Sequence, residues 1–352
     1  MKDIRRFSPL PLASLVLLAA CQDPNPPPTQ ETSYRPFNET NYASQKARVG
    51  LYQSMATLVD SSTLSASQFG AFDVNLTAIP TTARCVPTTS PTSGSIAHLF
   101  LQESLCTEVI GSVQRHSYAT GVGTDQLGQD MHFAITTGIQ AGATAQTQVE
   151  LKAAGERVLK TFERFFYEAI YDAMIERTPR GWDQAFGYFG ASNDGTTAAG
   201  LAAQIRSGDA RVRTSLEREL FVQFIQGRQE LESALQRAGK SPTDPNASIA
   251  PGESQTLDRL ITQIDEKMLL SLAYATAGEW DEWINDTAER PVEYAEGVAF
   301  TAAIQDYIRS RDQTSYNQLR AILDKPEAEF TQTDAQQLVT LIETTFGIDA
   351  TP

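Results

Sequence analysis

Hydrophobic residues recur at three- and four-residue steps over most of the chain, which is the spacing of one face of an α-helix. The longest pattern runs through 151–178 and stops at Pro179, because proline interrupts a helix. A second long pattern covers 211–237. Shorter patterns of the same kind predict helices at 45–59, 96–113, 257–277, 292–308 and 333–346, the last capped by Thr333.

Stretches rich in proline, glycine and threonine separate these helices, at 66–95, 117–130 and 242–252. Alternating patterns typical of β-strands are nearly absent, and no repeat of fixed period is evident. The sequence therefore predicts an all-α fold of antiparallel helical bundles joined by long loops.

The first residues have the pattern of a secretory signal. A basic start at 2–6 precedes a largely apolar run at 12–20 that ends in small residues, which predicts a signal peptide over 1–20. Residues 18–21, Leu-Ala-Ala-Cys, resemble the lipobox of bacterial lipoproteins, in which Cys21 would carry the lipid. The alternative is an ordinary secretory signal that is cut nearby.

The segment after the signal is too polar and proline-rich to form a core. We expect residues 21–33 to be the lipidated cysteine and a semi-extended tether, and residues 34–352 to form the helical domain, as one bundle or two. The apolar run is shorter than the ~20 residues that span a bilayer, so we expect the protein to be attached to the membrane through the lipid on Cys21. Gln22 resembles enterobacterial sorting signals and implies the outer membrane.

The net charge of the chain limits the kinds of partner that it is expected to bind. The chain holds 43 acidic and 28 basic residues, a net charge of -15. Such a surface repels nucleic acid and anionic lipid headgroups, so we predict no nucleic-acid partner. Acidity also keeps an exported protein soluble, and this simpler explanation is preferred to an acidic binding site.

Two cysteines remain besides Cys21. In an oxidising environment Cys85 and Cys106 are expected to form a disulfide, which would stabilise the fold by about 3 kcal/mol. A metal or catalytic pair is disfavoured, because the spacing fits no ligand motif and no histidine stands beside either cysteine. His98, His116 and His132 have no zinc-type spacing and are interpreted as surface or hydrogen-bonded histidines.

One stretch is unusually rich in aromatic residues and glycine. Residues 181–190, GWDQAFGYFG, resemble the WDEAFGYFG signature of imelysin-like bacterial lipoproteins. Segments at 34–55, 224–235 and 296–304 agree with that family in order. The resemblance implies an all-helical, exported protein of a group often linked to iron acquisition, in which some relatives were described as metallopeptidases with a G-x-H-x-x-E motif.

The family's candidate metal ligands are largely missing. Closer relatives read H-H-W-D-E-A-F-G-Y, where this chain has Arg180, Gly181 and Gln184 at the two histidines and the glutamate. A further histidine of the family corresponds to Val292 here, which leaves Glu296 alone. We therefore predict no metal site on these residues and no cofactor.

The same segment supplies the candidate ligand-binding residues. Trp182, Asp183, Phe186 and Tyr188 could form the wall of a pocket, with Glu296 as a further contact. The alternative is a plug of packed aromatic side chains that follows a helix break, in which Asp183 caps the next helix.

These observations predict a non-enzymatic, lipid-anchored envelope protein that binds a small ligand, a metal complex or a protein partner. The alternative is an imelysin-like metallopeptidase with relocated ligands. No nucleophile elbow, P-loop or dinucleotide fingerprint is present in the sequence. A second acidic and aromatic cluster, EWDEW at 279–283, is similar in sequence to residues 181–184. We interpret this similarity as two helix ends that share composition by chance.

Overall fold

The computed structural model describes residues 31–71, 84–87, 89–113, 116 and 127–350. The predicted signal peptide, Cys21 and nearly all of the tether lie outside the described residues, as do parts of the loops at 66–95 and 117–130. The described residues from Thr32 onward form one compact unit.

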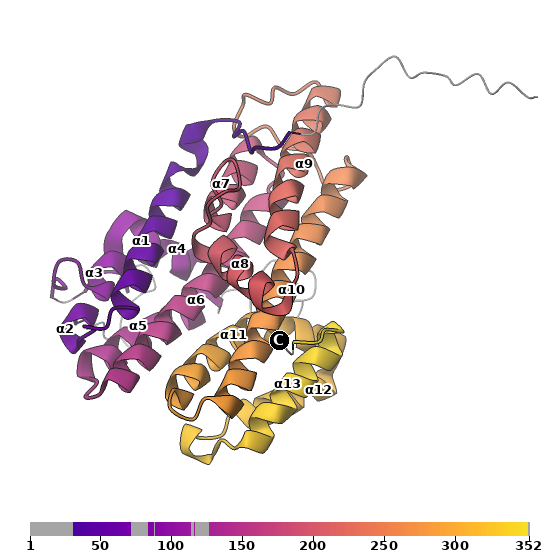
Figure 1. Cartoon of the computed structure of the whole chain (residues 1–352). Helices are drawn as coiled ribbons and strands as arrows, with labels where there is room; N and C mark the ends of the chain where they lie inside the picture. Colours follow the sequence, from indigo (N-terminus) through magenta and orange to yellow (C-terminus); the bar gives the residue numbers. More distant parts are fainter. Residues whose placement is uncertain (1–30, 72–83, 88, 114–115, 117–126, 351–352) are drawn as a thin grey trace, which may run out of the picture. The chain divides into compact units, whose positions relative to one another are not determined.

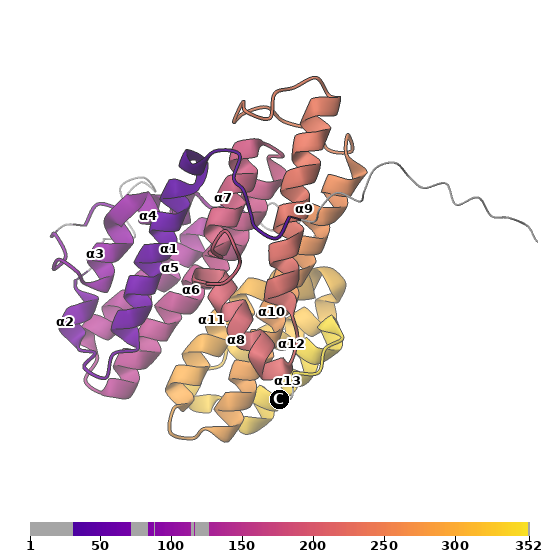
Figure 2. The ribbon, with the colours of Figure 1, turned by 45° about the horizontal axis from the view of Figure 1, so that its top comes forward.

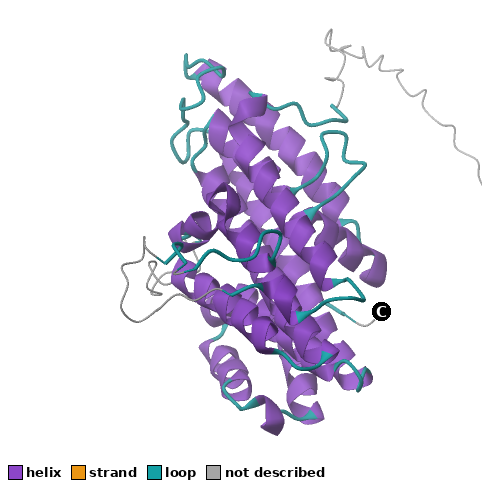
Figure 3. Ribbon diagram, turned by 90° about the vertical axis from the view of Figure 1, so that its left-hand side faces the viewer, coloured by secondary structure: helices purple, strands orange, loops and turns teal. Residues whose placement is uncertain are grey.

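The described part of this unit is built from α-helices joined by loops (Figures 1 and 3). The helices are α1 (Ala43–Val59), α2 (Ala66–Phe69), α3 (Ile96–Leu101), α4 (Leu105–Gly111), α5 (Leu127–Thr144), α6 (Gln148–Ile175), α7 (Pro179–Phe189), α8 (Gly200–Val212), α9 (Leu216–Arg237), α10 (Gln255–Asn285), α11 (Arg290–Arg311), α12 (Gln313–Leu323) and α13 (Gln332–Phe346). Short 3₁₀ turns occur at Glu39–Tyr42, Gln102–Ser104 and Glu327–Glu329.

The all-α prediction is confirmed. Among the described residues the only β-type pairing is an isolated bridge between Ala191 and Ala198. None of the described helices has both the length and the apolar character needed to cross a bilayer.

Helix α6 lies at the centre of the unit. A capping box between Thr147 and Glu150 starts it, and its apolar face, including Phe162 and Phe166, is fully buried. It packs against α5, α7 and α11, while α10 packs against α9, α11 and α13. Helices α6, α10 and α11 contact one another, and both views in Figures 1 and 2 show α8 beside α10. These four helices surround the site described below.

Several helix boundaries differ from the predictions. The pattern at 211–237 is broken into α8 and α9, because Arg213 adopts a left-handed backbone (φ 56°) that ends the first helix. The pattern at 96–113 is broken between α3 and α4 by positive φ angles at Glu103 and Ser104. Helix α5 begins at Leu127, inside the predicted loop. A hydrophobic pattern does not register such local turns.

Two caps also differ from the predictions. Helix α13 is capped by Thr331, whose side chain accepts a hydrogen bond from the backbone of Asp334, and Thr333 lies inside the helix. Helix α7 is capped by Thr178 with Pro179 in its first turn, so Asp183 is not its cap.

The predicted disulfide is confirmed. Cys85 and Cys106 are joined, with their Cα atoms 5.8 Å apart. The bond links the described residues 84–87 to α4.

Candidate functional site

The aromatic residues of α7 are packed inside the protein. Trp182 and Phe186 are fully buried, and the ring of Phe186 contacts those of Phe221 and Phe224. The Trp182 indole donates a hydrogen bond to the Phe224 carbonyl at 3.0 Å. Neither side chain lines a described pocket, so the arrangement matches the alternative of a packing plug.

Asp183 anchors the segment that precedes α1. Its carboxylate accepts four hydrogen bonds, at 2.8–3.1 Å, from donors in residues 34–41. Burial raises its pKa, and the bonds from the backbone of Asn38 and the amide of Asn41 oppose that rise. With four donors already bound, this carboxylate fastens the N-terminal segment onto α7.

Position 181, where the resemblance led us to expect a histidine, has no room for a side chain. A Cβ atom at Gly181 would lie 2.4 Å from the Ala173 carbonyl oxygen and 3.0 Å from a Glu176 carboxylate oxygen. Gln184 and Tyr188 instead line a polar pocket of about 430 Å³ together with Gln45. The missing ligand at position 181 is therefore consistent with the local packing.

Tyr188 also connects α7 to α1. Its hydroxyl accepts a hydrogen bond from Arg48 at 2.7 Å, and Arg48 also contacts the backbone of Glu103 and the carboxylate of Glu108. Burial raises the pKa of Tyr188 to about 12, and the positive charge of Arg48 opposes that rise. Of the predicted aromatic residues, Tyr188 is the one beside open space.

Glu296, the remaining predicted residue, belongs to a second group of acidic side chains on helices α10 and α11. Helix α10 carries Glu279 and Glu282, and α11 carries Glu293 and Glu296. A three-residue spacing places each pair on one face of its helix. One carboxylate oxygen from each of Glu279, Glu282 and Glu293 lies within 4.8 Å of the other two. Two Glu-x-x-Glu pairs on neighbouring helices thus converge.

Helix α6 adds a buried ammonium group and two more carboxylates. The Nζ atom of Lys160 lies 3.8 Å from Glu156, 3.8 Å from Glu163 and 4.0 Å from Glu296. These distances allow attraction but exceed the usual length of a hydrogen bond. We call Glu156, Glu163, Glu279, Glu293 and Glu296 the carboxylate cluster.

The negative charges of the cluster outnumber its positive charge. Lys160 is the ammonium group nearest to the five carboxylates; Lys152, which also acts on Glu156 and Glu296, is already paired with Glu289 at 2.5 Å, and Glu282 is paired with Arg211 at 2.6 Å. Burial lowers the pKa of Lys160, but the surrounding carboxylates more than reverse this and raise it well above its ordinary value. Lys160 therefore stays charged, and the excess of carboxylates must be balanced by protons or by another cation.

The pKa values of the carboxylates reflect this crowding. Burial is the main cause that raises the pKa of Glu156 to about 8 and that of Glu293 to about 7, and the Glu296 carboxylate raises both further. The same two causes raise the pKa of Glu279 well above its ordinary value. Several carboxyl groups consequently hold protons near neutral pH, and a bound cation could displace them.

Glu163 provides an unsatisfied oxygen. It is 1 % exposed, and its Oε1 atom accepts a hydrogen bond from the Tyr52 hydroxyl at 2.6 Å. Its Oε2 atom is buried and has no hydrogen-bond partner among the described residues. A buried carboxylate oxygen without a donor is costly, which indicates that the site has capacity for a positively charged ligand.

A pocket of about 270 Å³ opens onto the cluster from α8. Helix α8 contributes Arg211, whose guanidinium lies against α10 at Gly278. A Cβ atom at Gly278 would lie 1.8 Å from this guanidinium. We call this the Lys160 pocket; its charged and aromatic lining comprises Lys160, Arg211, Tyr274, Glu279, Glu282 and Glu296.

The sequence analysis identified Glu296 and missed the rest of this site. Glu279 and Glu282 belong to the EWDEW stretch, which we interpreted as a chance similarity, and Glu293 lies three residues before Glu296. The signal that could have found them is the repetition of Glu-x-x-Glu on two consecutive helices. Val292, at the family's other histidine position, is buried beside a separate pocket with Lys152 and Glu289.

The histidines are held in different surroundings. His116 is buried, pairs with Glu168 at 2.9 Å and with Asp265 at 3.2 Å, and stacks on Tyr171. Burial lowers the pKa of His116, but the two carboxylates outweigh it and raise the pKa to about 10. His132 is also buried, and the fold brings it close to the disulfide.

A comparison of the chain with family models, with curated proteins and with solved structures found no match.

Proposed function

We propose that this protein is an exported, lipid-anchored binding protein that captures a divalent cation in the Lys160 pocket. The observation that carries the proposal is the convergence of two Glu-x-x-Glu pairs with Glu156 and Glu163 around one ammonium group. Oxygen ligands from carboxylates are typical of sites for Ca²⁺, Mg²⁺ and Mn²⁺. The cation would be cargo or a ligand rather than a catalyst.

Charge balance supports a cation rather than an anion or a neutral ligand. Lys160, together with Lys152, which is already paired with Glu289, cannot neutralise five carboxylates. The raised pKa values of Glu156, Glu279 and Glu293 indicate that protons make up part of the difference. A divalent ion would replace those protons, so binding should release protons and strengthen with rising pH. The unsatisfied oxygen of Glu163 would gain a favourable electrostatic neighbour.

The anchoring part of the proposal rests on residues 1–33 of the sequence. The basic start, the short apolar run and the Leu-Ala-Ala-Cys ending support lipidation at Cys21, and Gln22 supports the outer membrane. If Cys21→Ala abolishes acyl labelling and releases the protein from the envelope, the anchor is supported. Retained label would contradict it.

The resemblance to imelysin-like lipoproteins remains part of the proposal. It rests on residues 181–190 and on three further segments, and a role in metal acquisition would suit both that resemblance and the carboxylate cluster. Peptide hydrolysis is the less supported alternative, because the cluster contains no histidine, whereas zinc peptidases combine histidine with carboxylate. Chelator-sensitive cleavage of an unfolded substrate by the purified protein would favour the alternative.

Calorimetric titration of the purified mature chain with Mn²⁺ and Ca²⁺ tests the binding proposal. The expected result is one ion per chain, with proton release measured in two buffers of different ionisation enthalpy. The double variant Glu279→Gln/Glu293→Gln should weaken binding at least ~10-fold. Glu266→Gln, which changes an exposed glutamate on the same helix, is the matched control and should bind as wild type does.

Three outcomes would contradict the proposal. The first is the absence of metal binding by the wild-type protein at about pH 7.5. The second is equal affinity in the double variant and in the control. Binding of a small organic diamine in place of a metal ion would likewise refute the assignment of the cation class.

A further inference from the structure

Helices α4 and α5 approach each other closely near the disulfide. Gly128 and His132 lie one turn apart on α5, and Cys106 and Ile110 lie one turn apart on α4. A Cβ atom at Gly128 would lie 2.2 Å from the Ile110 carbonyl oxygen, so only glycine permits this approach. The two helices cross at Gly128 and Ile110. One turn further along each helix, Cys106 therefore lies opposite His132.

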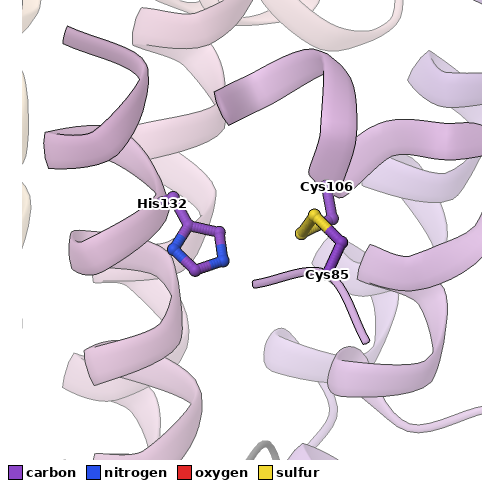
Figure 4. Close-up of side chains that lie close together, drawn as sticks. All are labelled: Cys85, Cys106 and His132. Atoms are coloured by element: carbon purple, nitrogen blue, oxygen red, sulfur yellow. A yellow bond between two sulfur atoms is a disulfide. The ribbon is translucent and has the colours of Figure 1, made fainter. Parts of the chain in front are cut away.

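The result is a compact group of one imidazole and two sulfur atoms. One ligand atom each from Cys85, Cys106 and His132 lies within 4.8 Å of the others. Figure 4 shows the His132 ring extending from α5 toward the disulfide. His132 is 0 % exposed and Cys106 is 1 % exposed, whereas Cys85 is half-buried and gives access from outside.

The imidazole is held in a fixed orientation. His132 is fully buried, and its ring forms a hydrogen bond with the backbone of Arg84. A hydrogen bond from one ring nitrogen to a backbone carbonyl is the usual support for a metal-binding histidine, because it fixes the tautomer.

We propose that Cys85, Cys106 and His132 form a second metal site, independent of the carboxylate cluster, which binds Zn²⁺ or a similar thiol-preferring ion after the disulfide is reduced. A dithiol reductant would supply two electrons and two protons, which convert the disulfide to two thiols while the reductant becomes a disulfide. Binding of the ion then releases the two thiol protons.

The backbone geometry is compatible with such a site. A tetrahedral zinc ion with Zn–S bonds of about 2.3 Å holds two sulfur atoms about 3.8 Å apart. The Cα atoms of Cys85 and Cys106 are 5.8 Å apart, so rotation of the two side chains reaches this separation without movement of the helices. Two thiolates and one imidazole leave a fourth position for water.

Cobalt(II) is a suitable probe for this site, because thiolate ligands give it a charge-transfer absorption that carboxylates do not. The full mature chain is titrated with Co²⁺ before and after reduction by a phosphine reductant, under exclusion of oxygen. The proposal predicts no thiolate band in the oxidised protein and a band that saturates at one ion per chain in the reduced protein. Zn²⁺ should abolish the band by displacement.

Four variants make the test specific. Cys85→Ser should lose the band, and His132→Gln should weaken cobalt binding at least ~10-fold. His98→Gln, which changes a half-buried histidine on α3, is the matched control and should behave as wild type. Glu279→Gln/Glu293→Gln should also retain the band, so failure of the carboxylate site is distinguished from failure of this one.

The proposal is overturned if the reduced wild-type protein gives no thiolate band, or if His132→Gln and His98→Gln bind cobalt equally. Circular dichroism covers the case in which reduction unfolds the chain. Recovery of helix on addition of Zn²⁺ would support the site, and persistent loss of helix with Zn²⁺ present would refute it.

Discussion

Replacing Glu156 by glutamine should change how stability depends on pH. Glu156 lies on α6, is 6 % exposed, and has a pKa raised from 4.5 to about 8, mainly by burial. Between these values the folded chain keeps a proton that the unfolded chain has lost. The contribution of this group is therefore fully present below pH 4.5 and is lost as the pH rises toward 8.

The size of the effect follows from proton linkage. A difference of one bound proton changes the free energy of unfolding by ~1.4 kcal/mol per pH unit. Glutamine has no proton to lose, so Glu156→Gln should make the decline of stability less steep by up to that amount between about pH 5 and pH 8. Because Glu156 and Glu296 titrate as a coupled pair, the expected change in the slope of stability against pH is smaller than this maximum, but its direction is the same.

Urea unfolding, followed by circular dichroism at about pH 5, 6, 7 and 8 in the presence of a chelator, measures this slope. Wild type, Glu156→Gln and the exposed control Glu266→Gln share the other titrating groups, including His116 and His132. The difference between the slopes therefore isolates Glu156. Equal slopes for wild type and Glu156→Gln, or a steeper decline in the variant, would refute the electrostatic account of the cluster.

Three further substitutions, with Gly50→Ala on α1 as a control, test the packing around α7 by denaturant unfolding. Phe186→Ala should lower the free energy of unfolding by about 3–5 kcal/mol, because its ring is fully buried among aromatic neighbours; a loss under ~1 kcal/mol would contradict the plug. Asp183→Asn should cost about 1.5–3 kcal/mol, because an amide has one acceptor oxygen for four donors, and a neutral effect would argue against the anchor. Gly227→Ala should destabilise, because its Cβ atom would lie 1.9 Å from the Trp182 ring, whereas Gly50→Ala, which has open space on α1, should stabilise by up to ~1 kcal/mol.

The helical fold could be predicted because its cause is local and periodic. Helix α6 covers Gln148–Ile175, close to the predicted 151–178, because its apolar face is long. It ends three residues early, before Arg177 with its left-handed backbone (φ 53°), and Pro179 begins α7. The break between α8 and α9 was missed because it depends on the backbone of Arg213 in a left-handed turn, which leaves no mark in a hydrophobic pattern. The disulfide followed from the cysteine count and an assumed oxidising environment.

The candidate sites depend on contacts that a single helix does not reveal. Glutamates three residues apart are common on exposed helix faces, so Glu279 and Glu293 became informative only once α10, α11 and α6 were seen to meet around Lys160. The sequence placed no histidine beside the cysteines, whereas the crossing of α4 and α5 brings His132 to them. Asp183 was predicted as a ligand-binding residue, with a helix cap as the alternative, and its actual partners were missed because residues 34–41 are remote in sequence.

The most direct test of the central claim is a crystal structure of the mature chain grown with Mn²⁺, examined by the anomalous scattering of the metal. The account predicts a single strong peak at the edge of the Lys160 pocket where Glu279 and Glu293 approach each other, about 2–2.6 Å from oxygens of both carboxylates. A Lys160 pocket without a metal peak, at a Mn²⁺ concentration that saturates the protein in solution, would contradict it.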